Sequence, residues 1–335
     1  MIYLDEPNIS RWEYLKAAMM VNDPSTRGVL TEKFESAMAD FLGVRFAIAT
    51  NSGTSALHLA LLVSGVIPEN TVFLPALTFV ATANAVSYCG ARVGLLDVDR
   101  KTWVLTEDTI QKGGKNLAVN SYGNPPRVST MVEDAAEGLG AVNRNQEPFI
   151  KTYSFNGNKT LTTGGGGLVV TNNKRTALRI KDLSTQARLM NGTHHSVGFN
   201  YRMPGLNAAL GLVQIKHLPG MVDKQRYFNS IYRAELSGIM EFQEATPGTD
   251  PSWWFTAGLF PEGTDIPRLQ VELSKKGVRT RRVFRPLSDS VPYMDDPEKF
   301  PNAYTIYRRG LCLPRSLRNS VADIYRVCEI IRRTV

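Results

Sequence analysis

The chain of 335 residues is poor in cysteine and has no long apolar run. Its three cysteines, Cys89, Cys312 and Cys328, are odd in number and lack CxxC spacing, so they predict neither a disulfide framework nor a zinc site. We expect them to be small buried hydrophobic residues. His194 and His195 are adjacent but have no other histidine or cysteine nearby, so we expect a polar loop and no metal site.

No window approaches the roughly 18 consecutive apolar residues of a membrane span. The first residues, MIYLDEPNISRWEYL, also lack the basic-then-apolar order of a secretion signal, which predicts a cytoplasmic protein with no membrane partner. The net charge of +8 comes without a long basic run or a recognised nucleic-acid motif. We therefore expect no nucleic-acid partner, and a modest positive field suits an anionic substrate.

Short runs rich in Val, Ile and Leu alternate with helix-period segments through the first two thirds of the chain. This alternation predicts the α/β fold class, with a mostly parallel sheet flanked by helices. From about residue 220 the pattern changes to a smaller α+β arrangement, so we expect a large domain over residues 1–218 and a small C-terminal domain over 219–335. The expected strands lie near 46–50, 72–75, 92–97, 117–121, 130–133, 151–155 and 167–171, and the segment VRTRRVF (278–284) is strand-like. The expected helices lie at 53–64, 78–88, 174–186, 206–216, 221–236, 267–277 and 320–333.

Two connections are shorter than this fold normally requires. About eight residues separate the strand ending near Tyr122 from the one starting near Met131, whereas a parallel crossover usually takes about a dozen or more and includes a helix. The link from Gly140 to Lys151 is also brief and has no helical period. We therefore expect extended chain, or a partner subunit, to cover part of one sheet face.

A lysine, an acid pair and a glycine run are close in the sequence. Lys159 ends the run SFNGNK, lies just before TTGGGG, and follows the acid of VEDAAEGLG by 25 residues. A pyridoxal phosphate enzyme needs an amine for a Schiff base, a carboxylate on the pyridine nitrogen and donors for the phosphate. Lys159 lies among Ser154, Phe155 and glycines, so desolvation is expected to lower its pKa and make the amine nucleophilic. A P-loop is rejected because GNKT lacks the adjacent Gly-Lys pair.

The segment FAIATNSGTSALHLALL passes from a strand through a polar turn into a helix, which places Gly53 and Thr54 near the first helical turn. Free backbone N–H groups and the helix dipole favour an anion there. A capping turn with no ligand, built on Asn51 and Ser52, is the other interpretation of this motif taken alone.

The acid pair Glu133 and Asp134 follows an apolar run, at the carboxyl end of an expected strand. Ligands of open α/β sheets bind at that edge. Because successive strand residues point to opposite faces, we expect only one of the two carboxylates to enter the site. Helix N-terminal acids, stabilised by the dipole, remain the alternative for this segment alone.

Six segments, in order, resemble one family, the pyridoxal-phosphate-dependent nucleotide-sugar aminotransferases of the DegT/DnrJ/EryC1/StrS group. They are NSGTSALHLAL, PALTFVATANAV, VEDAAEGLGA, YSFNGNKTLTTGGGG, GFNYRMPGLNAALGLVQI and GVRTRRVFRPL. SFNGNK, TTGGGG and DAAEGLG are most similar to the branch that aminates C4 of UDP-linked 4-keto-6-deoxy N-acetylhexosamines. The resemblance implies a fold type I homodimer with shared active sites. It also implies a ping-pong reaction in which L-glutamate converts pyridoxal phosphate to pyridoxamine phosphate, which then aminates the nucleotide-sugar ketone.

The resemblance also assigns residue roles. Lys159 matches the lysine that forms the Schiff base and later moves a proton between cofactor and sugar. Asp134 matches the aspartate on the pyridine nitrogen, Glu137 stands beside the ring 3-hydroxyl, and Phe79 matches the aromatic residue that stacks on the ring. Taken singly, Phe79 is better explained as a core residue, Ser154 as a strand hydroxyl and Asn200 as a turn residue, and only the joint order of the matches supports the roles. The positions that match phosphate-binding residues are Gly53, Thr54, Ser154 and, from the neighbouring subunit, Asn200.

The chain departs from the family at two histidines, which are replaced by Asn120 and Ser288. Both departures put substrate contacts in doubt, since neither replacement titrates near neutral pH as imidazole does. The segment GVRTRRVFRPL contains four arginines: Arg279, Arg281, Arg282 and Arg285. Two interpretations stay open for them: they contact the nucleotide diphosphate, or they lie on the solvent face of a strand.

Alternative functions remain open at this point. The first is a noncatalytic relative that binds pyridoxal phosphate or a sugar nucleotide as a sensor or scaffold, and the second is amination at C3. Retention of Lys159 and Asp134 together disfavours the sensor. Sugar dehydration is disfavoured because the similar C3-dehydratases carry histidine at the lysine position.

Overall fold

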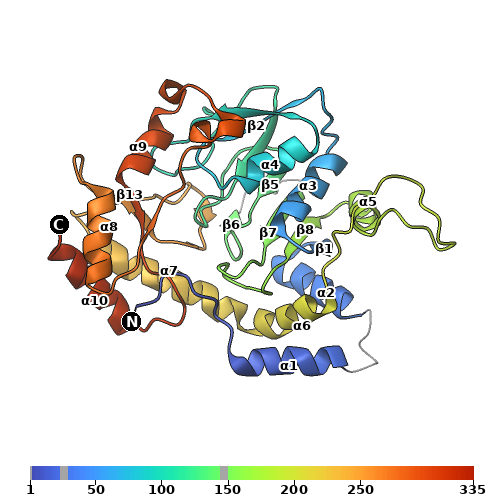
Figure 1. Cartoon of the computed structure of the whole chain (residues 1–335), viewed down its shortest axis with the longest axis horizontal. Helices are drawn as coiled ribbons and strands as arrows, with labels where there is room; N and C mark the ends of the chain where they lie inside the picture. Colours follow the sequence, from blue (N-terminus) through green and yellow to red (C-terminus); the bar gives the residue numbers. More distant parts are fainter. Residues whose placement is uncertain (1, 23–28, 144–149) are drawn as a thin grey trace.

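A computed structural model describes residues 2–22, 29–143 and 150–335 of the chain. Seven strands form the main sheet in the order β1-β8-β7-β5-β4-β2-β3 (Figure 1). Among these seven, only β8 runs against the others, because its pairings with β1 and β7 are antiparallel and the remaining pairings are parallel. The predicted mostly parallel sheet is thus confirmed. The strands are β1 (Phe46–Thr50), β2 (Thr71–Pro75), β3 (Arg92–Leu96), β4 (Lys115–Val119), β5 (Val132–Asp134), β7 (Ile150–Ser154) and β8 (Gly167–Thr171).

Helices pack on both faces of this sheet. Alternate strand residues point to opposite faces, so Ile48 and Val169 belong to one apolar cluster while Ala47 and Leu168 belong to another. The first cluster includes residues of α3 (Gly53–Val63), α4 (Ala81–Tyr88) and α5 (Lys174–Ser184). The second includes residues of α1 (Arg11–Asn22), α2 (Leu30–Leu42) and α6 (Gly205–Gln214).

The C-terminal part of the chain forms a second, antiparallel sheet in the order β12-β13-β11-β9, flanked by helices. This confirms the predicted smaller α+β region, whereas the boundary at residue 218 stays a prediction. The strands are β9 (Glu241–Phe242), β11 (Ala257–Leu259), β12 (Arg281–Arg282) and β13 (Gly310–Cys312). The helices are α7 (Leu218–Glu235), α8 (Ile266–Lys275), α9 (Pro301–Arg309), α10 (Val321–Arg332) and the short 3-10 turns η2 (Ile215–His217), η3 (Leu287–Asp289), η4 (Val291–Tyr293) and η5 (Pro297–Lys299).

The connection between β4 and β5 carries no helix: residues 120–131 are turns and extended chain. Val128 in this connection packs against Leu105 and Ala118, so extended chain covers the sheet there, as predicted. The second short link, from Gly140 to Lys151, includes residues 144–149, which lie outside the described residues. Its described part contains β6 (Val142–Asn143), which pairs with β10 (Thr249–Asp250).

The three cysteines are buried and form no disulfide, as predicted. In the part of the chain that the structure describes, no cluster of His, Cys, Asp and Glu side chains is suited to a metal ion. No helix of the described residues has the length and apolar character needed to cross a bilayer.

Candidate active site

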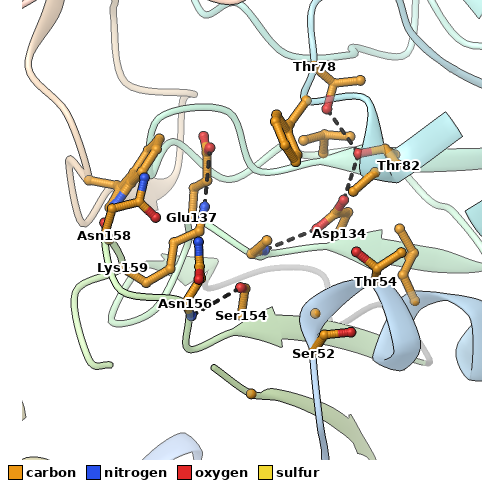
Figure 2. A pocket seen from close by; sticks show the side chains of 18 of the residues that line it. Ser52, Thr54, Thr78, Thr82, Asp134, Glu137, Ser154, Asn156, Asn158 and Lys159 are labelled. Carbon is orange, nitrogen blue, oxygen red and sulfur yellow. Dashed lines mark hydrogen bonds and ion pairs between the residues drawn. The ribbon is translucent and has the colours of Figure 1, made fainter. Parts of the chain in front are cut away.

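A cavity lies at the carboxyl ends of β5 and β7, where the first turn of α3 meets the main sheet (Figure 2). Its volume is about 230 Å³, whereas one water needs about 10–15 Å³. Open α/β sheets bind their ligands at this edge, so the cavity has both the position and the size of a ligand site. Of the eight predicted site residues, seven line it: Gly53, Thr54, Phe79, Asp134, Glu137, Ser154 and Lys159.

The amine of Lys159 is enclosed within this cavity. Its Nζ lies 3.5 Å from Glu137 Oε1 and 4.1 Å from the centroid of the Trp254 ring. Burial lowers the pKa of Lys159, while the negative charges of Glu137 and Asp134 act in the opposite direction. Burial also disfavours the charged form of Glu137 and so raises its pKa. Glu137 accepts a hydrogen bond from the backbone N–H of Tyr122 at 2.9 Å. The lysine is therefore a shielded amine with a depressed pKa, as a nucleophile requires.

Asp134, the last residue of β5, faces Lys159 from the opposite side of the cavity (Figure 2). The Thr82 hydroxyl of α4 donates to its Oδ2 at 2.7 Å, and the backbone N–H of Ala136 donates to its Oδ1 at 3.1 Å. Burial raises the pKa of Asp134, and these two donors lower it. Glu133 does not line the cavity and lies 3.9 Å from Lys151 Nζ, so only one acid of the pair enters, as strand alternation predicted.

The N-terminus of α3 forms another wall. Ser52 is the N-cap, and its hydroxyl accepts the backbone N–H of Ser55 at 3.1 Å, while Gly53 and Thr54 begin the helix. A Cβ on Gly53 would lie 2.8 Å from Ser154 Cβ, so the helix abuts the end of β7 directly. The first N–H groups of α3 and the Ser154 hydroxyl therefore meet in a place suited to an anion.

Gly53→Ala tests this close approach. The added methyl overlaps the Ser154 side chain, so we expect a loss of about 1–3 kcal/mol in the free energy of unfolding. We also expect weaker binding of a phosphate-bearing cofactor, because α3 must move away from β7. Thermal melting and cofactor titration measure the two effects. Gly220→Ala in α7 is the control, since beyond its own stretch of helix no atom of the described residues lies within 4 Å of its Cβ position. An unchanged melting temperature and cofactor affinity in Gly53→Ala would contradict the close packing of Gly53 against Ser154.

The other predicted residues lie as follows. Phe79 is at the rim, 54% exposed, with its ring centroid 6.0 Å from that of Phe284. Asn200 does not line the cavity of its own chain; its backbone oxygen accepts a hydrogen bond from Asn51 Nδ2 at 3.2 Å. Its role toward a neighbouring subunit stays a prediction. Asn120 and Ser288, which replace family histidines, are buried and also lie outside the lining, so neither changes the cavity wall.

The four arginines do not act as one cluster. Arg279 Nη1 lies 3.5 Å from Glu6 Oε1, and Arg285 Nε lies 2.6 Å from Asp289 Oδ2. Arg282 Nη2 donates to the backbone oxygen of Tyr307 at 2.5 Å. Only Arg281 lines the cavity, so the pattern is neither a shared phosphate site nor a uniform solvent face.

Trp254 and Thr82 are among the side chains of the site that were not predicted. Trp254 covers Lys159, and its Nε1–H donates to the backbone oxygen of Asn158 at 2.9 Å. No local signal places WWFTAGLF near a loop almost 100 residues earlier. Thr82 was also missed, although the sequence contains a signal for it: Thr78 and Thr82 are four residues apart, the spacing that places two side chains on one face of a helix. Their hydroxyls lie 3.1 Å apart.

The chain is similar to known proteins both in sequence and in fold. The model of the DegT/DnrJ/EryC1/StrS aminotransferase family matches residues 10–122 and 127–332. The GDP-perosamine synthase of Escherichia coli O157:H7 is 30% identical over 95% of this chain and 94% of its own length. The GDP-perosamine synthase of Caulobacter vibrioides is 33% identical over 94% of this chain and 92% of its own length. The UDP-4-amino-4,6-dideoxy-N-acetyl-beta-L-altrosamine transaminase of Campylobacter jejuni is 31% identical over 63% of each chain. The PMP form of the putative sugar aminotransferase Spr1654 of Streptococcus pneumoniae has the same fold. Its TM-score is 0.91 at 20% identity, over 99% of this chain and 97% of that one.

Proposed function

Because the chain belongs to the DegT/DnrJ/EryC1/StrS aminotransferase family, we propose that it transfers an amino group from L-glutamate to a nucleotide-linked 4-keto-6-deoxy sugar. Family membership makes it a pyridoxal-phosphate-dependent sugar aminotransferase. The observation that carries the proposal is the placement of Lys159 and Asp134 on opposite sides of one cavity, next to the N-terminus of α3.

The residues present fit the cofactor. The start of α3 and the Ser154 hydroxyl would hold the phosphate, and Asp134 would pair with the pyridine nitrogen. Glu137 would lie beside the ring hydroxyl and Phe79 against the ring face. When bound, pyridoxal phosphate supplies an aldehyde for amines and a ring that withdraws electrons from the bonds next to the nitrogen.

Side chains and backbone groups of the chain itself support this chemistry. Lys159, with a pKa lowered by burial, would carry a proton at Nζ between the cofactor and the sugar. Glu137 stabilises the protonated amine at 3.5 Å, and the Trp254 ring covers it against water. Thr82 and the N–H of Ala136 orient the Asp134 carboxylate and stabilise its charged form, which opposes the effect of burial.

The nucleotide is the part of the substrate for which two observations compete. Full-length relatives named GDP-perosamine synthase favour a GDP-linked hexose. SFNGNK, TTGGGG and DAAEGLG favour a UDP-linked N-acetylhexosamine, as does the relative named for a UDP-linked amino sugar over 63% of the chain. We propose the GDP-linked sugar first, because those relatives match over nearly the whole chain, and the UDP-linked sugar second.

We expect the holoenzyme to lose its visible absorbance band when L-glutamate is added, and to convert one member of a panel of GDP-, UDP- and dTDP-4-keto-6-deoxysugars into the amino sugar. Product mass identifies the member and NMR distinguishes C4 from C3 amination. A protein that binds the cofactor but shows no donor-dependent bleaching would instead be a noncatalytic sensor.

We further propose that the enzyme is a homodimer. The segment after α5 extends away from the body of the chain (Figure 1) and exposes Met190 and Val197, which are 108% and 84% exposed. Large exposed apolar side chains of this kind are typical of an interface. Asn200, placed outside the cavity of its own chain, lies in the strand-like end of the same segment. Sedimentation equilibrium at micromolar concentration tests the assembly.

A further inference from the structure

We propose that Arg281 binds a carboxylate of the amino-acid donor, and that Asp5 is the positioning residue that holds Arg281 until the donor arrives. This inference rests on the proposed function. Arg281 and Lys159 are the two cations among the described residues that line the cavity. Under the proposed function Lys159 condenses with the aldehyde of the cofactor, so Arg281 is the cation left to neutralise an anionic substrate.

The guanidinium of Arg281 is held in place but is not saturated. Among the described residues, its one ion pair is with Asp5 Oδ2 at 3.9 Å, and it makes no hydrogen bond there. Its Cζ lies 5.3 Å from the centroid of the Phe284 ring and 5.9 Å from that of Trp254. Aromatic neighbours orient the planar group while leaving its N–H donors free, and a guanidinium fork suits a carboxylate.

Asp5 belongs to the N-terminal segment, which packs on the C-terminal part of the chain. Leu4 O accepts the backbone N–H groups of Arg315 and Ser316 at 2.8 and 2.9 Å. Asn158, next to Lys159 in the chain, donates through Nδ2 to Asp5 Oδ2 at 3.4 Å. The pair between Asp5 and Arg281 is long and partly exposed, 24% and 33%, so a carboxylate with better geometry can replace it.

Position favours the donor over the nucleotide diphosphate. The Trp254 ring lies against both Lys159 Nζ and Arg281 Cζ, so a ligand on Arg281 is close to the reacting amine. In an amino acid the carboxylate is attached to the carbon that bears the amino group. In a nucleotide-linked sugar that is aminated at C4, the diphosphate is on C1, across the hexose ring. A short distance between anion and reacting carbon therefore matches the amino acid.

The test compares the two half-reactions and the binding of glutarate, which has the carboxylates of glutamate but no amine. In the holoenzyme, Arg281→Gln is expected to raise the glutamate concentration for half-maximal bleaching about 10- to 100-fold, as loss of a charge-assisted hydrogen bond implies. Glutarate binding, followed by its competition with glutamate, should weaken by a similar factor. Amination of the sugar by enzyme preloaded with pyridoxamine phosphate should change less than about 3-fold. The matched control is Arg279→Gln, two residues away and outside the cavity.

Asp5→Asn tests the proposed role of Asp5 independently. Removing its negative charge takes away the ion-pair partner of Arg281, so glutarate and glutamate are expected to bind about 3- to 10-fold more tightly. A merely structural role for Asp5 would weaken binding or leave it unchanged. Acetate and L-alanine, each with one carboxylate, show which carboxylate is bound.

The inference is overturned if Arg281→Gln impairs only the sugar half-reaction, if it impairs both equally, or if glutarate affinity is unchanged. Should Arg281→Gln fail to fold, the test is whether Asp5→Asn binds glutarate more tightly than the wild type, as predicted, or not. Failure of the proposed function gives a different result, since wild-type enzyme would then show no bleaching by glutamate at all.

Discussion

Lys159→Ala is expected to lower turnover by about 10⁴-fold or more while leaving cofactor binding partly intact. The variant loses the only amine of the described cavity lining. The anion site at α3 and the Asp134 carboxylate both remain, because neither depends on the lysine for its hydrogen bonds. Turnover is measured with glutamate and the accepted sugar, and cofactor binding by equilibrium dialysis.

Two comparisons make this result specific. Lys174→Ala removes an exposed lysine at the start of α5, outside the cavity, and should leave turnover within about 2-fold of the wild type. Added methylamine should restore part of the activity in Lys159→Ala but not alter the control, because a free amine replaces the missing proton carrier. Undiminished turnover in Lys159→Ala would overturn the assignment of the lysine.

Asp134→Asn is expected to lower turnover by about 10²- to 10⁴-fold with little loss of folding. The amide has nearly the same shape and its single oxygen still accepts the Thr82 hydroxyl, although its NH2 group then faces the Ala136 N–H. It no longer supplies the charge that keeps a pyridine nitrogen protonated. The change also removes a negative charge that raises the pKa of Lys159, so the pKa of the lysine in the cofactor-free protein should fall. Chemical labelling of Lys159 as a function of pH follows that shift.

Thr82→Val is the matched comparison for Asp134. It removes the 2.7 Å hydrogen bond to Oδ2 but keeps the carboxylate and the donor at Ala136. We expect a loss of about 10-fold, the size of one hydrogen bond to a charged group. If Asp134→Asn lost no more activity than Thr82→Val, the charge of Asp134 would have no part in catalysis.

The strands were predictable because buried strands are short apolar runs that end at turn residues. The ranges predicted at 46–50 and 167–171 are those of β1 and β8. Helix α1 gave no prediction, because Ala17 is its one buried residue and it has no apolar stripe. Helix α2 was also missed, although Leu30, Phe34 and Met38 are buried at four-residue spacing. The strand expected within 278–284 is reduced to Arg281–Arg282 in β12.

By itself, the amino-acid sequence placed an amine at Lys159, an acid at Asp134 and a helix start at Gly53, each at or shortly after the end of a strand. Only the tertiary structure decided that Trp254 and Arg281 complete the cavity, and that Asp5 reaches Arg281 from the far end of the chain. The reason is physical. Local patterns record which face a residue occupies and where an element ends, whereas the approach of distant segments depends on how two sheets and their helices pack together.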